Sequence, residues 1–430
     1  MIHPDKSFGK FLLLWSGGFI SAIGSGLTSF GLGVYVFEQT GKAAATALVL
    51  LLGFLPTILL SAFAGVLADR YDRRLLMVLG DGLSAIGLVF IFICLMDGRA
   101  ALWQICIGVT ISSVFSSLLE PAYKATITDL LTKEQYTKAS GLVQISGSAK
   151  YLISPVLAGA LLSVWDIRLL LVIDIGTLIV TVLATLVVRR GLAAQKTGHE
   201  ASLSRAFKDG WHVLTQNKGV LTLVWMGTAI TFCLGFIQTL AGPLMLSFSN
   251  SAVLGTVETI TASGLLVTSI LLGIVPIKGS YTKHLSGSLF LAGLFMAGFG
   301  LRESVILIGV SGFLFFSMLP VANASLDYLL RTNIENAFQG RAWGLIGVIS
   351  QLGYIAAYAS SGLLADHLFT PLLLDGGILA NSLGKITGTG SGRGIGLLIV
   401  VAGLLLCATA IAVYHSKDIR SLDREVPDVL

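Results

Sequence analysis

The chain has 430 residues, of which 54% are hydrophobic and only 12% are charged. A soluble globular domain is about 25% charged, so this composition excludes a soluble enzyme, a secreted module and a disordered scaffold. The mean hydropathy of +0.86 indicates that the chain lies in a lipid bilayer. The formal net charge of +5 would suggest a nucleic-acid partner in a soluble protein. In a membrane protein it reflects basic cytoplasmic loops, and we expect no nucleic acid.

Apolar runs between polar breaks predict an all-α integral membrane protein, since about 20 apolar residues cross a bilayer as a helix. The longest polar break divides the chain into an N-terminal six-helix half over 1–190, a cytoplasmic linker over 191–218 and a C-terminal six-helix half over 219–415. A cytoplasmic tail follows over 416–430. The twelve predicted transmembrane helices are, in chain order, 11–37, 44–68, 75–97, 101–127, 139–164, 168–189, 219–246, 252–277, 284–300, 304–330, 342–367 and 395–415.

Lysines and arginines are concentrated in alternate loops. If the N-terminus is cytoplasmic, 20 of the 28 basic residues fall in cytoplasmic segments and 6 fall on the opposite side. The remaining two, Lys124 and Lys150, lie in helices or at their edges. Because cytoplasmic loops carry the excess of basic residues, we expect both termini in the cytoplasm and the protein in the inner or plasma membrane.

The two predicted halves resemble each other in sequence. The segment LLEPAYKATITDLL over 118–131 matches SMLPVANASLDYLL over 317–330 and aligns Pro121 with Pro320. Further matches in corresponding helices follow in the same order. A parallel duplication of six helices is typical of transporters whose substrate site lies between two halves.

The segment GVLADRYDRR, which begins at Gly65, lies at the predicted cytoplasmic end of the second helix. It resembles the signature of the major facilitator superfamily, Gly-x-Leu-Ala-Asp-Arg followed by further basic residues. The resemblance implies a gating latch that holds one access state closed, in which Gly65 allows close helix packing. Asp69 is expected to cap the start of the next segment and to pair with a cytoplasmic partner. The charge relay of the latch is completed by Arg70, Arg73 and Arg74. The alternative is a basic topology anchor, which needs neither Gly65 nor Asp69.

Asp72 stands where the family usually has Gly, and this acidic variant is similar to the drug:H+ antiporter-3 branch of macrolide-efflux-like proteins. Asp81, one to two turns inside the third helix, is expected to support the latch, and the alternative is that it binds a proton. The equivalent place in the second half keeps Gly273 but has Ile277 instead of the acid, so we expect the latch in one half only. The resemblance implies a major facilitator fold that exports a drug, macrolide, siderophore or peptide product by proton antiport and alternating access.

Charges inside predicted membrane helices are costly and normally line a cavity or pair with another charge. Glu120 and Lys150 lie on consecutive antiparallel helices, roughly 12 and 16 Å from their shared loop, which predicts a buried ion pair. Glu120 is then either the proton-responsive acid or one member of a purely structural pair. We call Glu120, Lys150 and Asp327 the coupling set, in which Asp327 is expected to be a cytoplasmic gate residue. Asp174 is interpreted as an outer-gate or interfacial residue.

The fifth predicted helix contains GLVQISGSAKYLISPVLAG, which is similar to the antiporter motif of exporting branches of the family. Gly141, Pro155 and Gly159 match that motif. Ser154 is a small substitute, and Lys150 departs from the motif, which has Gly there. Small residues let helices approach closely and a proline bends a helix, which suits a rocking interface and favours export. The alternative is generic close packing.

The Gly-rich stretch over 384–396 lacks a phosphate-binding pattern and is predicted to be an outer loop, which resembles that of exporters in siderophore or nonribosomal-peptide pathways. The four cysteines and six histidines show no metal-ligand spacing. We therefore expect no enzyme activity, no metal and no cofactor. The expected partners are a small-molecule substrate, protons and the lipid bilayer, and the expected working unit is a monomer. A lysophospholipid flippase of the same fold and a non-transporting membrane sensor remain as alternatives.

Overall fold

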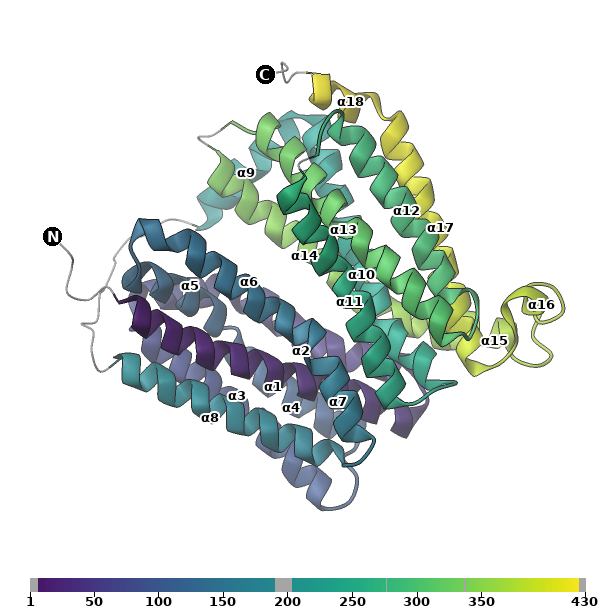
Figure 1. The fold of residues 1–430 in the computed structure, drawn as a ribbon, viewed down its shortest axis with the longest axis horizontal. Helices are drawn as coiled ribbons and strands as arrows, with labels where there is room; N and C mark the ends of the chain where they lie inside the picture. Colours follow the sequence, from purple (N-terminus) through teal and green to yellow (C-terminus); the bar gives the residue numbers. More distant parts are fainter. Residues whose placement is uncertain (1–6, 190–202, 276, 336–337, 425–430) are drawn as a thin grey trace. The chain divides into compact units, whose positions relative to one another are not determined.

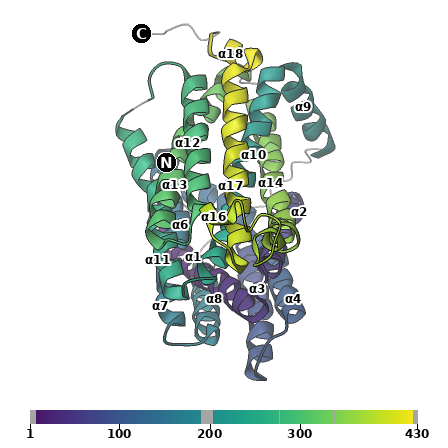
Figure 2. The same ribbon diagram turned by 90° about the vertical axis from the view of Figure 1, so that its right-hand side faces the viewer.

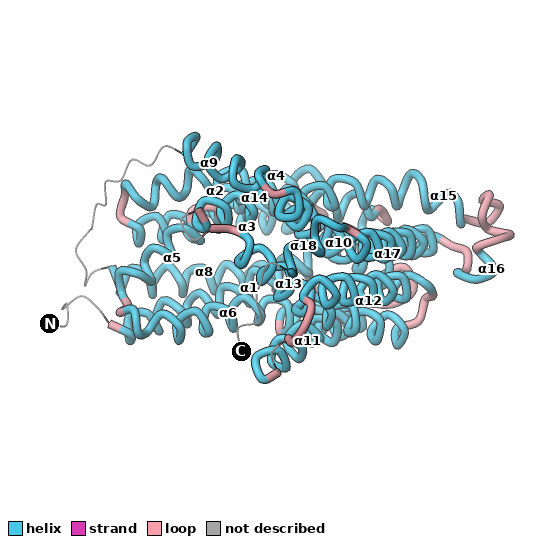
Figure 3. Tube along the Cα trace, turned by 90° about the horizontal axis from the view of Figure 1, so that it is seen from above, coloured by secondary structure: helices cyan, strands magenta, loops and turns pink. Residues whose placement is uncertain are grey.

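The computed structural model describes residues 7–189, 203–275, 277–335 and 338–424. Every regular element in these ranges is a helix, as Figure 3 shows with helices in cyan and loops in pink. Twelve stretches are long and apolar enough to cross a membrane, which confirms the predicted number of spans. The chain is therefore a multi-pass, all-α membrane protein.

The helices fall into two units, and the boundary between the units crosses two helices. The first residues of α2, up to Ala47, belong to the second unit, and the first residues of α11, Ser251–Thr256, belong to the first. The helices up to residue 189 are α1 (Phe8–Thr40), α2 (Ala43–Arg70), α3 (Arg73–Met96), α4 (Leu102–Ser116), α5 (Leu119–Leu130), the 3₁₀ turn η1 (Lys133–Gln135), α6 (Tyr136–Leu152), α7 (Ser154–Leu162) and α8 (Ile167–Arg189).

The helices after residue 202 begin with α9, which precedes the first span of the second unit. In chain order they are α9 (Leu203–Gln216), α10 (Lys218–Leu246), α11 (Ser251–Ile274), α12 (Tyr281–Leu301), α13 (Val305–Asn333), α14 (Gln339–Leu364), the π-helical turn η2 (Ala365–Phe369), α15 (Thr370–Leu373), α16 (Gly384–Thr387), α17 (Ser391–His415) and α18 (Lys417–Arg424).

Corresponding spans pack together within each unit. In the first unit α1 packs against α8 and against α6 and α7, and α3 packs against α8 and α4. In the second unit α10 packs against α17 and α14, and α12 packs against α17 and α13 (Figure 1). Five spans of each unit therefore pack in the same order, and these contacts do not include α2 or α11.

Two of the predicted helices are divided in the structure. The fourth span breaks into α4 and α5 shortly before Pro121, and the fifth breaks into α6 and α7 at Ile153, just before Ser154 and Pro155. A proline lacks the backbone N–H and clashes with the preceding turn, but it is tolerated in the first turn of a helix. Each break therefore lets a new helix begin close to its proline.

Two helices lie in segments that were predicted as linker and tail. Leu214 of α9 is fully buried, as is Ile419 of α18, so both helices pack an apolar side chain against the second unit. Figure 2 shows α18 turning away from the end of α17. Residues 190–202 of the predicted linker and 425–430 of the predicted tail lie outside the described residues.

One end of each unit carries most of its arginines and lysines, and we call it the basic end. Because successive spans alternate in direction, α3 begins at the basic end of the first unit with Arg73, and α12 begins at that of the second unit two residues before Lys283. Fully or nearly fully buried apolar side chains, including Phe11, Leu76 and Leu130, form a core cluster behind the first basic end. This core positions the charged residues described next.

Candidate functional site

An ion network links three helices at the basic end of the first unit. Nη1 of Arg73 donates to Oδ1 of Asp129 at 2.6 Å, and Nη2 of Arg74 lies 3.7 Å from Oδ2 of the same carboxylate. Nε of Arg73 also donates to the backbone carbonyl of Ala68 in α2, at 3.3 Å. The network ties the start of α3 to α5 and α2. Its charged side chains are only 6% to 16% exposed, so loss of one partner would leave a nearly buried charge.

Asp72, and not Asp69 as expected, caps α3 and links that helix to α8. Its Oδ1 accepts a hydrogen bond from the backbone N–H of Arg74 at 3.1 Å, which satisfies one free donor of the first turn. Its Oδ2 accepts from Nε of Arg189, the last residue of α8, at 2.8 Å. The acid that departs from the resembled signature therefore holds two helices together.

The remaining residues of the predicted latch have different surroundings. Arg70 ends α2 with an exposed side chain. No described atom lies within 4 Å of the Cβ that a larger residue would add at Gly65. The Asp69 side chain lies outside the described part of the chain.

Two buried carboxylates lie inside the first unit. Asp81 on α3 is 3% exposed and Asp174 on α8 is 2% exposed. The Ser25 hydroxyl on α1 donates to Oδ1 of Asp174 at 3.3 Å, and Thr177 donates to the same oxygen at 3.5 Å. These two hydroxyl donors hold the Asp174 carboxylate between α1 and α8. Because an unpartnered charge inside the membrane is costly, this cluster is a candidate proton-responsive site.

The predicted ion pair between Glu120 and Lys150 is wrong. Glu120 accepts from Nζ of Lys124 at 2.6 Å, one turn along α5, and these two side chains are 76% and 70% exposed. Depth below a shared loop fixes the height of a residue, whereas pairing also depends on the direction in which each helix turns its side chain. An exposed ion pair in a membrane-spanning helix requires a water-filled face.

The motif on the fifth span contains residues with different surroundings. Ser154 is fully buried and donates to a backbone carbonyl of α1 at 3.0 Å, next to Pro155 at the start of α7. A Cβ added at Gly159 would collide with the backbone of Ser251, so only glycine fits there. Gly141 is exposed, and no described atom lies within 4 Å of where its Cβ would be.

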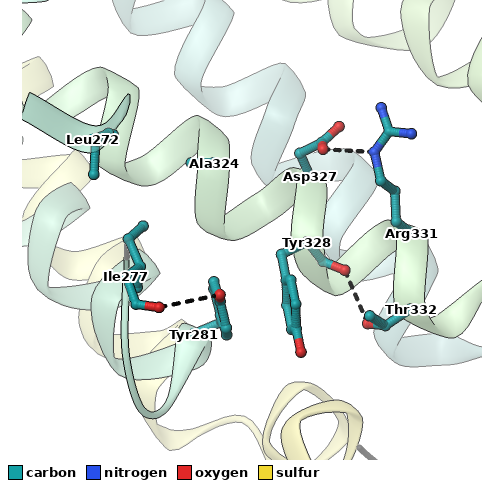
Figure 4. A pocket seen from close by; sticks show the side chains of 8 residues that line it. All are labelled: Leu272, Ile277, Tyr281, Ala324, Asp327, Tyr328, Arg331 and Thr332. Atoms are coloured by element: carbon teal, nitrogen blue, oxygen red, sulfur yellow. Dashed lines mark hydrogen bonds and ion pairs between the residues drawn. The ribbon is translucent and has the colours of Figure 1, made fainter. Parts of the chain in front are cut away.

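The basic end of the second unit contains a pocket of about 440 Å³. Tyr281, the first residue of α12, stacks on Tyr328 of α13, with ring centroids 3.6 Å apart and ring planes inclined by 10°. The Tyr281 hydroxyl donates to the carbonyl of Ile277 at 3.3 Å (Figure 4). The pocket is lined by Leu272, Ile277, Tyr281, Ala324, Asp327, Tyr328, Arg331 and Thr332.

Asp327, which belongs to the predicted coupling set, lies on the wall of this pocket. Its Oδ2 accepts from Nε of Arg331 at 2.7 Å, and the two side chains are 45% and 58% exposed. The guanidinium also lies 5.0 Å from the ring centroid of Trp343 on α14, within the range of a cation–π interaction. Arg331 is therefore held between a carboxylate and an aromatic ring.

The C-terminal helix α18 holds the start of α12. The Asp423 carboxylate accepts from the backbone N–H groups of Tyr281 and Thr282, each at 3.2 Å. It also accepts from the hydroxyl of Ser280, the N-cap of α12. Ile419 is fully buried beneath these contacts. One side chain from outside the spans thus satisfies free donors at the start of a membrane helix.

Sequence reasoning missed the roles of Asp129, Arg189 and Asp423 and interpreted Asp174 as an outer-gate or interfacial residue. The sequence contained a signal for the capping role of Asp72, because an acid directly before an apolar run is typical of a helix N-cap. Asp129 and Arg189 lie near helix ends, where charges are common at a membrane surface. Only the folded structure shows which of these charges meet.

The described residues contain no group of three or more His, Cys, Asp or Glu side chains that could hold a metal ion. The carboxylates and basic side chains can instead change the partners with which they form ion pairs. A proton added to a carboxylate, or a charged ligand bound by its partner, removes the attraction between the two groups. The charged groups of both basic ends and the Asp174 cluster are therefore suited to binding and release rather than to covalent chemistry.

A profile described as Major Facilitator Superfamily matches residues 14–358. Macrolide efflux protein A of Streptococcus pyogenes is 29% identical over 369 residues, which cover 84% of this chain and 90% of that protein. The lysophospholipid transporter LplT of Escherichia coli O1:K1 is 26% identical over 223 residues, 49% of this chain and 52% of that protein.

Among solved structures, the nucleoside transporter NupG aligns with a TM-score of 0.71 at 15% identity, covering 95% of this chain and 100% of that one. At this identity the likeness shows the fold alone. The matched family is one of transporters and not of enzymes.

Proposed function

This chain belongs to the major facilitator superfamily, and on that premise we propose that it exports an amphipathic small molecule by proton antiport. The substrate class is a drug such as a macrolide, or a siderophore or peptide product. The similarity to a macrolide efflux protein over 90% of that protein's length supports export. The observation that carries proton coupling is the buried Asp174 carboxylate with its hydroxyl donors Ser25 and Thr177.

The positive-inside rule supports a topology with both termini in the cytoplasm of the inner or plasma membrane. The two six-helix halves, 1–190 and 219–415, then open the substrate pathway to each side of the membrane in turn. The linker 191–218 and the tail 416–430 lie in the cytoplasm. The ion network around Asp129 acts as the latch of one access state, because its charges are partnered within the unit and are nearly buried.

Asp174 is the coupling acid in this proposal. Its carboxylate is almost inaccessible to water and accepts from Ser25 and Thr177. A proton on Asp174 neutralises the carboxylate and weakens the hydrogen bonds that it accepts, whereas loss of the proton restores them. Because Asp174 is on α8 and Ser25 on α1, protonation changes the force between two spans.

Two matched variants test this assignment. Asp174→Asn keeps the side-chain size but cannot exchange a proton, and we expect it to lower proton-driven efflux by about tenfold or more, equivalent to about 1.4 kcal/mol. Glu120→Gln makes the same chemical change at an exposed acid. If Glu120→Gln abolishes coupling and Asp174→Asn does not, Glu120 is the coupling acid and the assignment to Asp174 fails.

Export itself is tested by expressing the protein in an efflux-deficient host. The expected result is lower susceptibility to macrolides, or to another amphipathic toxin in a panel that includes siderophores. A proton uncoupler should restore accumulation of the labelled compound. If the purified protein transports no solute when any ion gradient is imposed, a non-transporting sensor becomes the better interpretation.

A lysophospholipid flippase is a second candidate, supported by the similarity to a lysophospholipid transporter over about half of each chain. Membrane vesicles that receive labelled macrolide or labelled lysophospholipid separate the two functions. Movement of the lysophospholipid alone would replace drug export as the function.

A further inference from the structure

The pocket at the basic end of the second unit changes from apolar to charged along its length. On α13, Ala324 lies about one turn deeper in the span than Asp327 and Tyr328, and Arg331 and Thr332 lie about one turn nearer the basic end. Leu272 and Ile277 add further apolar surface. A lipid molecule has the same order of groups at a membrane surface, with acyl chains below and a polar headgroup above.

The charged pair in this pocket retains unused binding groups. Among the described residues, the Arg331–Asp327 contact engages Nε of the arginine and Oδ2 of the carboxylate. Both terminal nitrogens of Arg331 and Oδ1 of Asp327 have no described hydrogen-bond partner. Figure 4 shows the two charged groups side by side above the stacked tyrosines. The two terminal nitrogens of a guanidinium can donate side by side to phosphate oxygens. A free carboxylate oxygen can accept from an ammonium group.

We propose that this pocket binds an aminoethyl phosphate group, such as the zwitterionic headgroup of phosphatidylethanolamine. Arg331 binds the phosphate, and Asp327 binds the ammonium. The apolar part of the ligand lies along Leu272 and Ala324. The volume of about 440 Å³ is within the range of small-ligand pockets and suits a headgroup rather than a whole phospholipid.

The charge pair also explains selectivity for a zwitterion. An anionic headgroup without an ammonium would meet Arg331 but would be repelled by Asp327. A simple cation would meet Asp327 but would be repelled by Arg331. Only a ligand that carries both charges satisfies both side chains, and discrimination therefore depends on repulsion as well as attraction. This inference concerns binding, so it can fail while the proposed export holds.

The test measures equilibrium binding to the purified full-length protein in detergent, with fluorescent short-chain phosphatidylethanolamine and phosphatidylglycerol as probes. We expect the wild type to bind phosphatidylethanolamine about tenfold more tightly than phosphatidylglycerol. Asp327→Asn should remove most of this preference, and Arg331→Gln should weaken the binding of both lipids about tenfold. Lys283→Gln, an exposed charge change on α12 outside the pocket, should change neither affinity.

Soluble phosphoethanolamine identifies the source of the ligand. Competition only at much higher concentration than the lipid supports a bilayer lipid, whereas equal potency supports the same headgroup chemistry from a water-soluble molecule. If Arg331→Gln does not fold, Arg331→Lys keeps the charge but loses the forked geometry and should still weaken phosphate binding. Equal binding of the two lipids by the wild type, or unchanged affinities in the folded pocket variants, would overturn the proposal.

Discussion

The basic ends of the two units follow the same plan with different chemistry. Arg73 is the first residue of α3 and pairs with Asp129 of α5, whereas Tyr281 is the first residue of α12 and stacks on Tyr328 of α13. The first contact is ionic and the second is aromatic. Each contact ties the start of the third span to the end of the fourth.

The repeated segments show that these partners occupy equivalent positions. Aligning 118–131 with 317–330 places Asp129 opposite Tyr328, and both α3 and α12 begin directly after a residue whose side chain caps the helix. The two halves therefore place these partners at equivalent positions but use an ion pair in one half and an aromatic stack in the other. An ion pair responds to salt, protons and charged ligands, whereas a stack of neutral rings does not. The first end is thus suited to be a charge-sensitive latch, and the second to be a fixed contact beside a pocket.

The largest effect is expected from removing the acid of the ionic contact. Asp129→Ala leaves Arg73 and Arg74 without their carboxylate, and breaking a buried pair in this way costs about 3–5 kcal/mol. The residual exposure of these side chains places the expected loss near the lower value. Thermal unfolding of the purified protein measures it, with Asp129→Glu as the charge-preserving control. Unchanged unfolding of Asp129→Ala would show that the network does not stabilise the first unit.

A smaller effect is expected from removing the aromatic contact. Tyr328→Ala loses a ring pair worth about 0.5–1.5 kcal/mol beyond its buried area, whereas Tyr328→Phe keeps the stack. The loss in Tyr328→Ala should be the same at low and high salt, unlike that in Asp129→Ala. A similar salt dependence for both variants would remove the distinction between the two ends.

The cap supplied by α18 is expected to contribute about 1 kcal/mol, as side-chain caps generally do. Asp423→Ala should therefore speed hydrogen exchange at the backbone amides of Tyr281 and Thr282, which lose their acceptor. Asp418→Ala is the matched control, because Asp418 is an exposed acid on the same helix. Equal exchange in the two variants would mean that α18 does not hold α12.

The smallest effect is expected at the link between α3 and α8. Arg189 is 39% exposed and Asp72 is 18% exposed, so their pair is worth about 0–1 kcal/mol. Arg189→Gln should lower the unfolding temperature slightly at low salt and hardly at all at high salt. A loss as large as that of Asp129→Ala would assign the main latch to Asp72 instead.

The number and approximate position of the spans could be predicted from the sequence because a bilayer leaves few solutions for the backbone. Every polar backbone group must be paired within the membrane, so long apolar runs become helices. The segment beginning at Gly65 likewise predicted the family, which the profile match shows. The helix interruptions near Pro121 and Pro155 could also have been predicted from the sequence, since proline disfavours a continuous helix.

The partners of the charged residues could not be predicted in the same way. Glu120 and Lys150 have suitable depths, but Glu120 pairs along its own helix with Lys124. Pairing depends on helix rotation, which an apolar run does not specify. The role of Asp423 was also hidden, because α18 is too short to form a span and becomes ordered by packing against the second unit.

Proton-driven transport by the purified protein tests the central claim most directly. Proteoliposomes that contain the wild type or Asp174→Asn receive labelled macrolide with and without an imposed proton gradient. The account predicts gradient-dependent accumulation in the wild type and loss of that dependence in Asp174→Asn, with macrolide binding retained. Equal movement with and without the gradient in the wild type, or unchanged gradient dependence in the variant, would contradict it.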